Sequence, residues 1–303
     1  MRRKHFNPRP KKEEVKNAEE KKEPPLDEVK TKWTEDKRFI LDLPDVKEDD
    51  LPFVSVLTIT RNRSHFFPLF FSNWNSFKYP KEKIEWVIID DSDTDELKDK
   101  LSKETRIKYF YLKSVLNIAD KRNYGVKQCK GTHIVHMDDD DYYFDDSVLA
   151  KIRVLLYYKD KECVVSIPFG IYNLHNNSSA IVDSEGNDLP EATMAYTKKF
   201  WKEQKFGYST EDKSKSEWYG LCNGRRNKII NMPFWFNIIS LTHLQNTTQR
   251  PIKQVQGCAN FYSKLWSSEM KKLINDLEEI VRTKAKTVKL QKILDIKKQL
   301  KQK

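Results

Sequence analysis

Cysteine is scarce in this chain of 303 residues, and its four cysteines are far apart. None belongs to a Cys-x-x-Cys pair, and none has a histidine nearby at the spacing of zinc ligands. The sequence therefore predicts reduced, structural thiols and no zinc site. These thiols belong to Cys129, Cys163, Cys222 and Cys258.

Long apolar runs are also missing from the sequence. No stretch of about 18 apolar residues is available to cross a bilayer. The N-terminus, which begins Met-Arg-Arg-Lys, lacks the apolar segment of a signal peptide. We therefore expect a soluble, cytoplasmic protein.

The body of the chain lacks a net charge of either sign, although the whole chain carries +11. Residues 39–263 contain 31 basic and 31 acidic side chains, so the entire excess lies in residues 1–38 and 264–303. A fold without a positive field does not attract a polyanion. We expect no nucleic-acid partner, and we assign any contact with a partner or a membrane surface to the basic terminal segments.

Composition divides the chain into three parts. Residues 1–38 are rich in Lys, Glu and Pro, which predicts a disordered basic tail because burial could not offset the entropy cost of ordering it. Residues 39–260 have the apolar content of a globular domain. Residues 261–303 are predicted to form a C-terminal amphipathic helical extension.

Apolar residues in this extension recur at intervals of four and three, which places them on one helical stripe. They are Trp266, Met270, Leu273, Leu277 and Ile280. Three interpretations remain open: a helix lying on its own domain, a coiled-coil or partner-binding helix, and a helix on a membrane surface.

Short β-rich runs alternate with helical segments in the middle of the chain, which predicts a largely parallel α/β sheet. The predicted strands are residues 54–59, 85–90, 107–112 and 134–137. The predicted helices are residues 66–77 and 118–129, with a further helix opened by Asp93 and Asp95. Each strand ends in polar residues at its carboxyl edge, where open α/β sheets bind ligands.

Four successive aspartates, residues 138–141, follow the last of these strands. Their carboxylates repel one another unless a cation lies among them. Hard oxygen ligands of this kind suit Mg²⁺ or Mn²⁺ bound together with a substrate phosphate. The alternative interpretation is a solvated acidic turn.

Four blocks of the sequence together resemble GT-A fold glycosyltransferases of the family 2 type. The blocks are residues 54–62, residues 87–95, Asn117 with residues 121–123, and the aspartate run, in that order. The resemblance covers about residues 53–150. It implies an α/β fold with a GT-A, Rossmann-like open mixed sheet flanked by helices.

The resemblance also implies which residues hold the nucleotide sugar. In similar enzymes the ends of the first two strands contact the nucleotide, a role that falls here on Thr60, Arg61 and Asp91. A carboxylate can accept the imide N–H of uracil, which favours a UDP-sugar. A charge at a helix N-terminus is the alternative role for Asp91. Arg122 is expected near the nucleotide.

The family's Asp-x-Asp motif corresponds to Asp138, Asp139 and Asp140. By this resemblance Asp138 and Asp139 contact the nucleotide sugar, and Asp140 ligates Mn²⁺ or Mg²⁺ at the diphosphate. Asp141 leaves the register of the motif open by one residue.

Residues 238–250 are predicted to form a strand that leaves the sheet with polar groups at its end, and two of these residues complete the expected donor site. In several related enzymes a histidine in this region completes metal coordination, and His243 is the matching candidate. Arg250 could pair with phosphate. Ordinary structural or exposed roles remain the alternatives for both residues.

Sugar transfer also needs a base for the hydroxyl of the acceptor. Related enzymes place this carboxylate well after the Asp-x-Asp motif. We choose Glu217, because a glutamate followed by an aromatic residue and an Asn-Gly turn most resembles the family pattern. Asp212 is the second candidate.

These features predict a metal-dependent glycosyltransferase that moves a sugar from a nucleotide donor to a glycan, a protein or a lipid-linked sugar. Inversion at the anomeric carbon is implied by the family alone. A sugar nucleotidyltransferase is disfavoured, because it needs a glycine-rich loop after the first strand to wrap a triphosphate, and residues 60–64 contain no glycine. A non-catalytic GT-A-like scaffold remains the main alternative.

Overall fold

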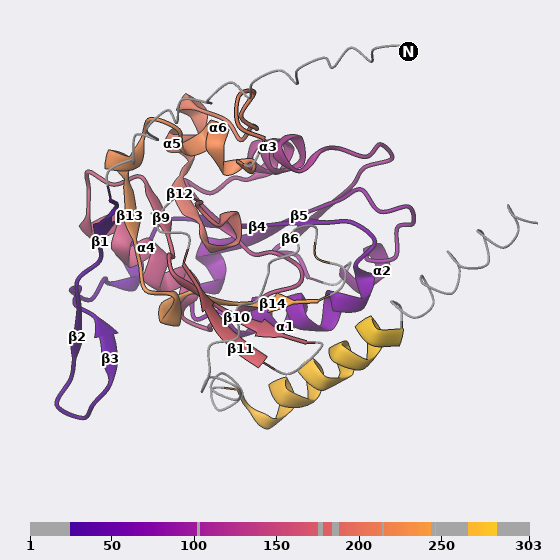
Figure 1. Ribbon diagram of the computed structural model, residues 1–303, viewed down its shortest axis with the longest axis horizontal. Helices are drawn as coiled ribbons and strands as arrows, with labels where there is room; N and C mark the ends of the chain where they lie inside the picture. The colour runs from indigo at the N-terminus through magenta and orange to yellow at the C-terminus, as the bar shows by residue number, and fades with distance from the viewer. Residues whose placement is uncertain are drawn as a thin grey trace, which may run out of the picture.

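The computed structural model describes residues 25–101, 104–174, 178–183, 188–213, 215–243, 246 and 266–283. These residues form an eight-stranded sheet, a four-stranded sheet and a two-stranded hairpin. Helices pack on both faces of the larger sheet (Figure 1).

The larger sheet has the strand order β1-β13-β9-β12-β7-β4-β5-β6. In that order the strands are β1 (Asp27–Glu28), β13 (Ile229–Asn231), β9 (Cys163–Val165), β12 (Ala195–Thr197), β7 (His133–His136), β4 (Val54–Thr60), β5 (Ile84–Asp90) and β6 (Ile107–Tyr111). The smaller sheet consists of β11 (Ser178–Val182), β10 (Phe169–Asn173), β14 (Ile238–Thr242) and β8 (Tyr142–Tyr143), and the hairpin of β2 (Thr31–Trp33) and β3 (Phe39–Leu41). The helices are α1 (Phe67–Ser76), α2 (Lys98–Leu101), α3 (Ile118–Gln128), α4 (Ser147–Tyr157), α5 (Lys198–Glu203) and α6 (Trp218–Cys222).

The larger sheet is mixed, as the sequence predicts. Strand β12 runs antiparallel to β7 and β9, whereas the other pairs in the sheet are parallel. Every residue of β5 is buried, which fits a central parallel strand covered on both faces. Alternate residues face different cores: Trp86 packs in the core that contains α1 and α4, and Val87 packs in the core that contains α3 and α5.

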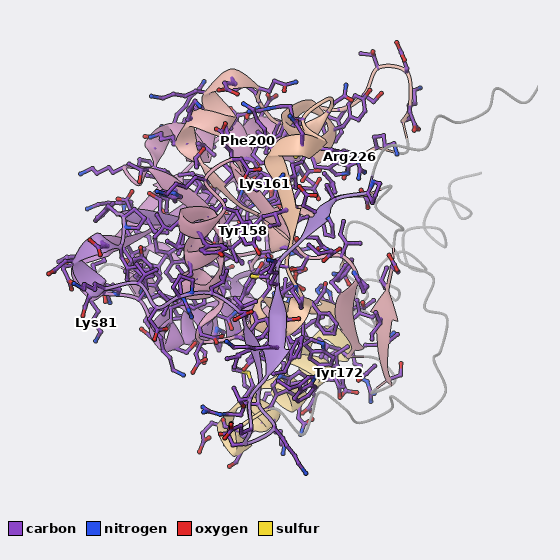
Figure 2. All side chains as sticks on the ribbon, turned by 90° about the vertical axis from the view of Figure 1, so that its left-hand side faces the viewer. Lys81, Tyr158, Lys161, Tyr172, Phe200 and Arg226 are labelled. Atoms are coloured by element: carbon purple, nitrogen blue, oxygen red, sulfur yellow. The ribbon has the colours of Figure 1, made fainter. Side chains whose placement is uncertain are left out.

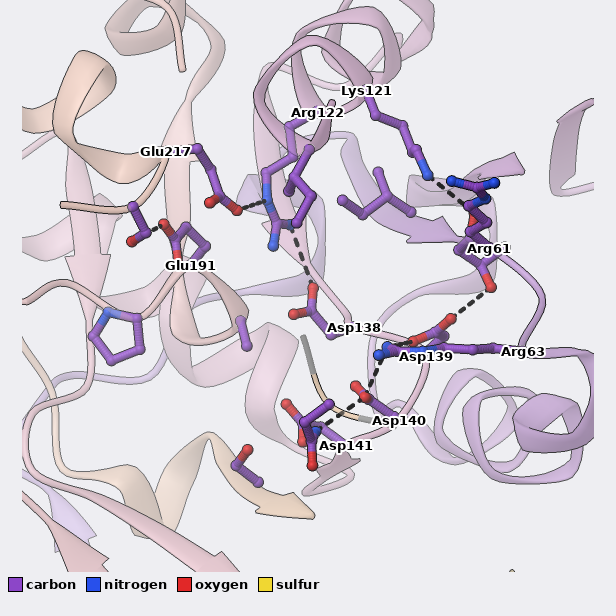
Figure 3. A pocket seen from close by; sticks show the side chains of 18 of the residues that line it. Arg61, Arg63, Lys121, Arg122, Asp138, Asp139, Asp140, Asp141, Glu191 and Glu217 are labelled. Atoms are coloured by element: carbon purple, nitrogen blue, oxygen red, sulfur yellow. Dashed lines mark hydrogen bonds and ion pairs between the residues drawn. The ribbon is translucent and has the colours of Figure 1, made fainter. Parts of the chain in front are cut away.

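Helix α3 lies close against β4, and this contact positions the site. The side chain of Asn117 caps the helix by accepting from Asp120 N at 2.8 Å. A Cβ at Gly125 would lie 2.5 Å from Leu57 Cδ1, so any larger residue would force the Leu57 side chain to shift. The helix therefore holds residues 121 and 122 close to the carboxyl end of β4 (Figure 3).

The predicted strands and the helices α1 and α3 are confirmed within two residues of their expected bounds. The prediction that a helix opens at Asp93 and Asp95 is wrong, because the helix that follows β5 begins only at Lys98, the first residue of α2. Both aspartates instead bind neighbouring segments: the carboxylate of Asp93 accepts from Asn62 Nδ2 in the turn after β4 at 2.9 Å, and that of Asp95 accepts from the Tyr109 hydroxyl on β6 at 2.7 Å.

The predicted boundary of the N-terminal tail, at residue 38, is wrong. Residues 1–24 lie outside the described residues, but β1 and β2 fall within the segment expected to be disordered. Lys161 Nζ donates to Asp27, and Lys30 N donates to the Tyr158 hydroxyl at 3.2 Å; Figure 2 labels both partners on the domain. These contacts and the pairing of β1 with β13 order the segment, although it has few apolar residues.

Residues 268–283 form a helix, drawn in yellow in Figure 1. Its apolar face packs on the main core through Ile274, Leu277 and Val281, and Trp266 before it contacts the ring of Tyr142. This packing agrees with a helix lying on its own domain. The apolar stripe that is buried in the structure is rotated around the helix from the stripe predicted from sequence. Ile280, which belongs to the predicted stripe, is 38% exposed, whereas Val281 is buried.

The cysteines that the structure describes, Cys129, Cys163 and Cys222, are buried free thiols, and Cys258 lies outside the described residues. Among the helices of the described ranges, none combines the length and the apolar character needed to cross a bilayer.

Candidate functional site

A cleft of about 580 Å³ opens where β4 and β7 end at their carboxyl edge. Carboxylates and cationic side chains alternate around it, as Figure 3 shows. The carboxylates belong to residues 138–141, Asp188, Glu191 and Glu217, and the cations to Arg61, Arg63, Lys121, Arg122, Lys213 and Lys215.

The middle of the aspartate run is held by residues from β4 and the turn after it. Asp139 is buried, and its carboxylate accepts from the Thr60 hydroxyl at 2.5 Å and from Arg63 Nη1 at 2.9 Å. Burial raises the pKa of Asp139 to about 6, against the opposing charge of Arg63. Thr60 and Asp139, both predicted to contact the donor, are therefore brought together by the fold.

Asp140 shares the same guanidinium. Its Oδ2 lies 2.8 Å from Arg63 Nη1 and 3.0 Å from His243 Nε2. Burial disfavours the Asp140 carboxylate, but the charge of Arg63 and the hydrogen bond with His243 outweigh it and lower the pKa of Asp140. The two residues predicted as metal ligands thus lie in direct contact.

The other two aspartates of the run differ in what they face. Asp141 is buried and its Oδ1 accepts from Leu241 N at 2.8 Å, which ties the run to β14. The Asp138 side chain is 25% exposed, more than those of Asp139 and Asp140. Asp141 therefore links the run to β14 and also lines the cleft, and the register of the motif stays open.

The residues predicted to bind the nucleotide are only partly in the cleft. Arg61 lines it, 3.6 Å from an exposed partner, Asp93. Asp91 is buried behind the Lys121 side chain, which donates to it, and Asp91 Oδ2 accepts from Leu116 N at 2.9 Å. Lys121 itself lines the cleft, and although it stands in the third block its role was not predicted.

Arg122 links the two sides of the cleft rather than facing open space. Its Nε donates to Glu217 Oε1 at 3.0 Å and its Nη1 to Asp138 Oδ1 at 3.3 Å. The arginine side chain is only 5% exposed. Figure 3 shows it between the two carboxylates.

The structure distinguishes the two predicted bases. Glu217 is buried at the start of α6 and lines the cleft. Asp212 is exposed and is not among the residues that line the cleft in the described part of the chain. Of the two candidates, Glu217 lines the cleft and Asp212 does not, and the role of either as the base stays a prediction.

Glu191 is a residue that sequence reasoning missed. It lies in a 3-10 turn (Glu191–Thr193) before β12, is half-buried, and lines the cleft beside Glu217. Burial, and next the charge of Glu217, raise the pKa of Glu191 to about 8. No motif surrounds it in the sequence, so only tertiary structure could identify it. Arg63 was missed as well, although it follows the first block.

The donor atoms of the run suit a hard divalent cation. Asp138 and Asp140 offer carboxylate oxygens, and His243 offers an imidazole nitrogen. Within the described residues no three such side chains form a preassembled metal centre, and the guanidinium of Arg63 supplies the positive charge at Asp140. A cation whose coordination is completed by phosphate oxygens fits this arrangement, since Mg²⁺ and Mn²⁺ sites commonly combine few carboxylates with substrate phosphates.

Sequence comparison finds a family model described as Glycosyl transferase family 2, which matches residues 55–209. An uncharacterized glycosyltransferase of Rickettsia felis is 32% identical over 77 residues, which are 24% of this chain and 13% of that protein. Another, from Haemophilus influenzae, is 28% identical over 118 residues, which are 38% of this chain and 42% of that protein. The matches thus span less than half of the curated relatives.

Among solved structures, the fold is similar to that of PcManGT, a mannosyltransferase from Pyrobaculum calidifontis in complex with GDP-Man and Mn²⁺. The TM-score is 0.50 at 13% identity, and the match covers 66% of this chain and 59% of that one. This likeness concerns the fold. Residues 55–209 include the aspartate run and Glu191 but end before Glu217.

Proposed function

Because this chain belongs to glycosyl transferase family 2, we propose that it transfers a sugar from a nucleotide-sugar donor to an acceptor hydroxyl, with a divalent cation and with inversion. One observation carries the proposal: Arg122 joins the aspartate run to a buried glutamate across a single cleft. The run suits the diphosphate side of the reaction, and Glu217 suits the hydroxyl side.

In the proposed reaction, Glu217 accepts the proton of the acceptor hydroxyl as its oxygen bonds to the anomeric carbon. The bond between that carbon and the donor phosphate oxygen breaks on the opposite side, and its electron pair leaves with the nucleoside diphosphate. Attack opposite to the leaving group inverts the anomeric configuration. Arg122 keeps Glu217 oriented throughout.

Asp138, Asp140 and His243 would hold the cation. When bound, it neutralises charge that develops on the leaving diphosphate, an effect worth several kcal/mol in the transition state. Arg63 lies where it can contact the same phosphates, because its Nη1 is within 2.9 Å of both Asp139 and Asp140. PcManGT, whose fold is similar, was solved with Mn²⁺, which makes this ion the first one to test.

Lys121 limits the choice of nucleotide base. Asp91 is buried, with its two carboxylate oxygens bonded to Lys121 and to Leu116 N, so of this pair only the Lys121 ammonium lines the cleft. An ammonium can donate to the carbonyl that uracil and guanine carry where cytosine and adenine carry an amino group. We propose a uridine donor first, with guanosine as the base to test beside it, since PcManGT binds GDP-Man.

The test is release of free nucleotide from a panel of UDP-sugars and GDP-sugars by the purified full chain, with and without Mn²⁺. We expect release from at least one donor that requires the metal and stops when EDTA is added. ADP-sugars and CDP-sugars serve as controls and should remain intact. Absence of release from every donor, combined with no binding of UDP or GDP in calorimetry, would favour a non-catalytic scaffold.

A further inference from the structure

The carboxyl group of Glu191 contacts both residues that flank Glu217 in the chain. Its Oε1 accepts from the Ser216 hydroxyl at 2.8 Å and from Trp218 N at 2.9 Å. Glu217 opens α6 and has no side-chain cap of its own. The backbone that carries Glu217 is therefore anchored on one oxygen of the half-buried Glu191 side chain.

The segment of Glu191 is anchored at its other end to the strand that precedes the aspartate run. Glu191 O accepts from Met194 N, and Met194 O accepts from His136 N, both at 3.0 Å. The next residue, Ala192, uses its carbonyl to accept from the Tyr143 hydroxyl at 2.9 Å. That hydroxyl in turn accepts from Asp138 N at 2.9 Å.

Together with the covalent chain between Glu191 and Ala192, these contacts link the aspartate run to both sides of Glu217. His136 connects this path with Arg122, because its Nδ1 lies 3.1 Å from Arg122 Nη1 and 3.0 Å from Glu191 O. Arg122 orients the Glu217 carboxylate, whereas Glu191 fixes the backbone from which the carboxylate projects. Two supports of one side chain keep it within the narrow range of positions that proton transfer requires.

We propose that Glu191 is a positioning residue, which sets the distance between Glu217 and the aspartate run without taking part in the chemical step. The inference rests on the proposed function, because it assumes Glu217 as the base. It predicts that the hydrogen-bond acceptor at position 191 matters and that its negative charge does not. Burial and the neighbouring charge of Glu217 raise the pKa of Glu191, which favours its neutral form, and a glutamine amide reproduces its shape and its acceptor oxygen.

The experiment compares Glu191→Gln with Glu191→Met in steady-state kinetics of the full chain. Glu191→Gln is expected to keep kcat within about threefold of wild type. Glu191→Met is expected to lower kcat roughly 10- to 100-fold with little change in the KM of the donor, because a displaced base slows the chemistry and leaves the nucleotide site intact. Ser216→Ala, which removes one of the two donors, should give a smaller loss.

Glu85 provides the matched control, since it is a buried glutamate at the opposite edge of the sheet. Its Oε1 also accepts two hydrogen bonds, from the Ser55 hydroxyl at 2.6 Å and from Lys130 N at 2.5 Å. Glu85→Met should lower the melting temperature but leave the kcat of the folded protein unchanged. This control separates positioning of the base from a general effect of a lost buried hydrogen bond.

The outcomes separate failure of this inference from failure of the proposed function. If wild type releases no nucleotide, the proposed function is wrong. If wild type is active and Glu191→Met retains full kcat, Glu191 does not position the base. If Glu191→Gln is as damaging as Glu191→Met, the carboxyl group itself takes part in the chemistry, and the positioning role is overturned.

Discussion

The two sides of the cleft are built from different kinds of chain segment. The donor side consists of four consecutive aspartates and the ends of neighbouring parallel strands, so its residues are adjacent in sequence or in the sheet. The base side brings together residues from a helix and two loops: Glu217 is 95 positions from Arg122 and 26 from Glu191. A short motif can encode the first side, whereas the second exists only after the chain has folded.

The two sides also differ in how tightly their charges are enclosed. On the donor side, Arg63 and Asp138 keep 18% and 25% of their side chains exposed, whereas Asp139 and Asp140 keep 1% and 9%, so a ligand would reach this side through Arg63 and Asp138. On the base side, Arg122 and Glu217 keep only 5% and 8%. The donor side is suited to exchanging ligands, and the base side is suited to keeping one geometry, because a buried ion pair is costly to disrupt.

The largest effects are expected from removing the central carboxylate of each side. Asp140→Ala should abolish turnover and also Mn²⁺-linked binding of nucleoside diphosphate, because it deletes the proposed metal ligand. Glu217→Gln should lower kcat roughly 10²- to 10⁴-fold, the usual contribution of a general base, and leave that binding within about threefold. Calorimetry of UDP and GDP with Mn²⁺ and single-turnover rates measure the two effects. Equal loss of binding in both variants would refute the division of the cleft into two sides.

An intermediate effect is expected from Arg122→Lys, which tests the connection between the sides. An ammonium cannot reproduce the separate Nε and Nη1 contacts to Glu217 and Asp138. We expect kcat to fall roughly 10- to 100-fold through misplacement of the base.

Arg225→Lys is the control for Arg122→Lys. Arg225 is also buried, and its Nη1 donates to Phe200 O at 2.7 Å, away from the cleft. This control should lose stability but keep its kcat. The connecting role of Arg122 is contradicted if the two variants lose the same fraction of kcat.

This contrast explains how much of the site could be predicted from sequence. Strands β4 and β5 were predictable, because each is a near-continuous apolar run that ends in polar residues, which is typical of a central parallel strand. The aspartate run follows such a strand directly. Its placement beside Thr60 then follows from the parallel pairing of β4 with β7.

The remaining part depends on contacts between distant segments. Glu191 lies in a segment with no motif, and its importance comes from Ser216 and Trp218, which are 25 and 27 positions away. Residues 25–38 likewise adopt a defined structure because β1 pairs with β13 and because Lys161 binds Asp27. Both partners lie more than 130 positions further along the chain. The composition of a segment gives no information on the distant residues that it contacts in the fold, so it could not predict this structure. The predicted metal and donor base remain predictions that the nucleotide-release experiment tests, and inversion remains a prediction.

The smallest effect on turnover is expected from Lys151→Met, behind the donor side. Lys151 is fully buried in α4, its Nζ has no hydrogen-bond partner, and it lies 5.4 Å from the centre of the Tyr143 ring. Burial lowers the pKa of Lys151 to about 7, against the attraction of the Asp138 charge. Unlike the cations that line the cleft, this lysine is enclosed without an ion-pair partner within hydrogen-bond distance.

The sign of its pH dependence follows from linkage. Between pH 7 and about 10.4 the unfolded chain binds a proton at Lys151 that the folded chain largely lacks, so stability rises with pH across this window. Lys151→Met removes the titration. It should therefore raise the free energy of unfolding by on the order of 2–4 kcal/mol at pH 7, and by less than about 1 kcal/mol at pH 10. Urea unfolding at both pH values measures the difference, and kcat should stay within about twofold. An equal gain at both pH values would mean that Lys151 is charged in the fold, and that a buried cation behind Asp138 contributes to the field of the donor side.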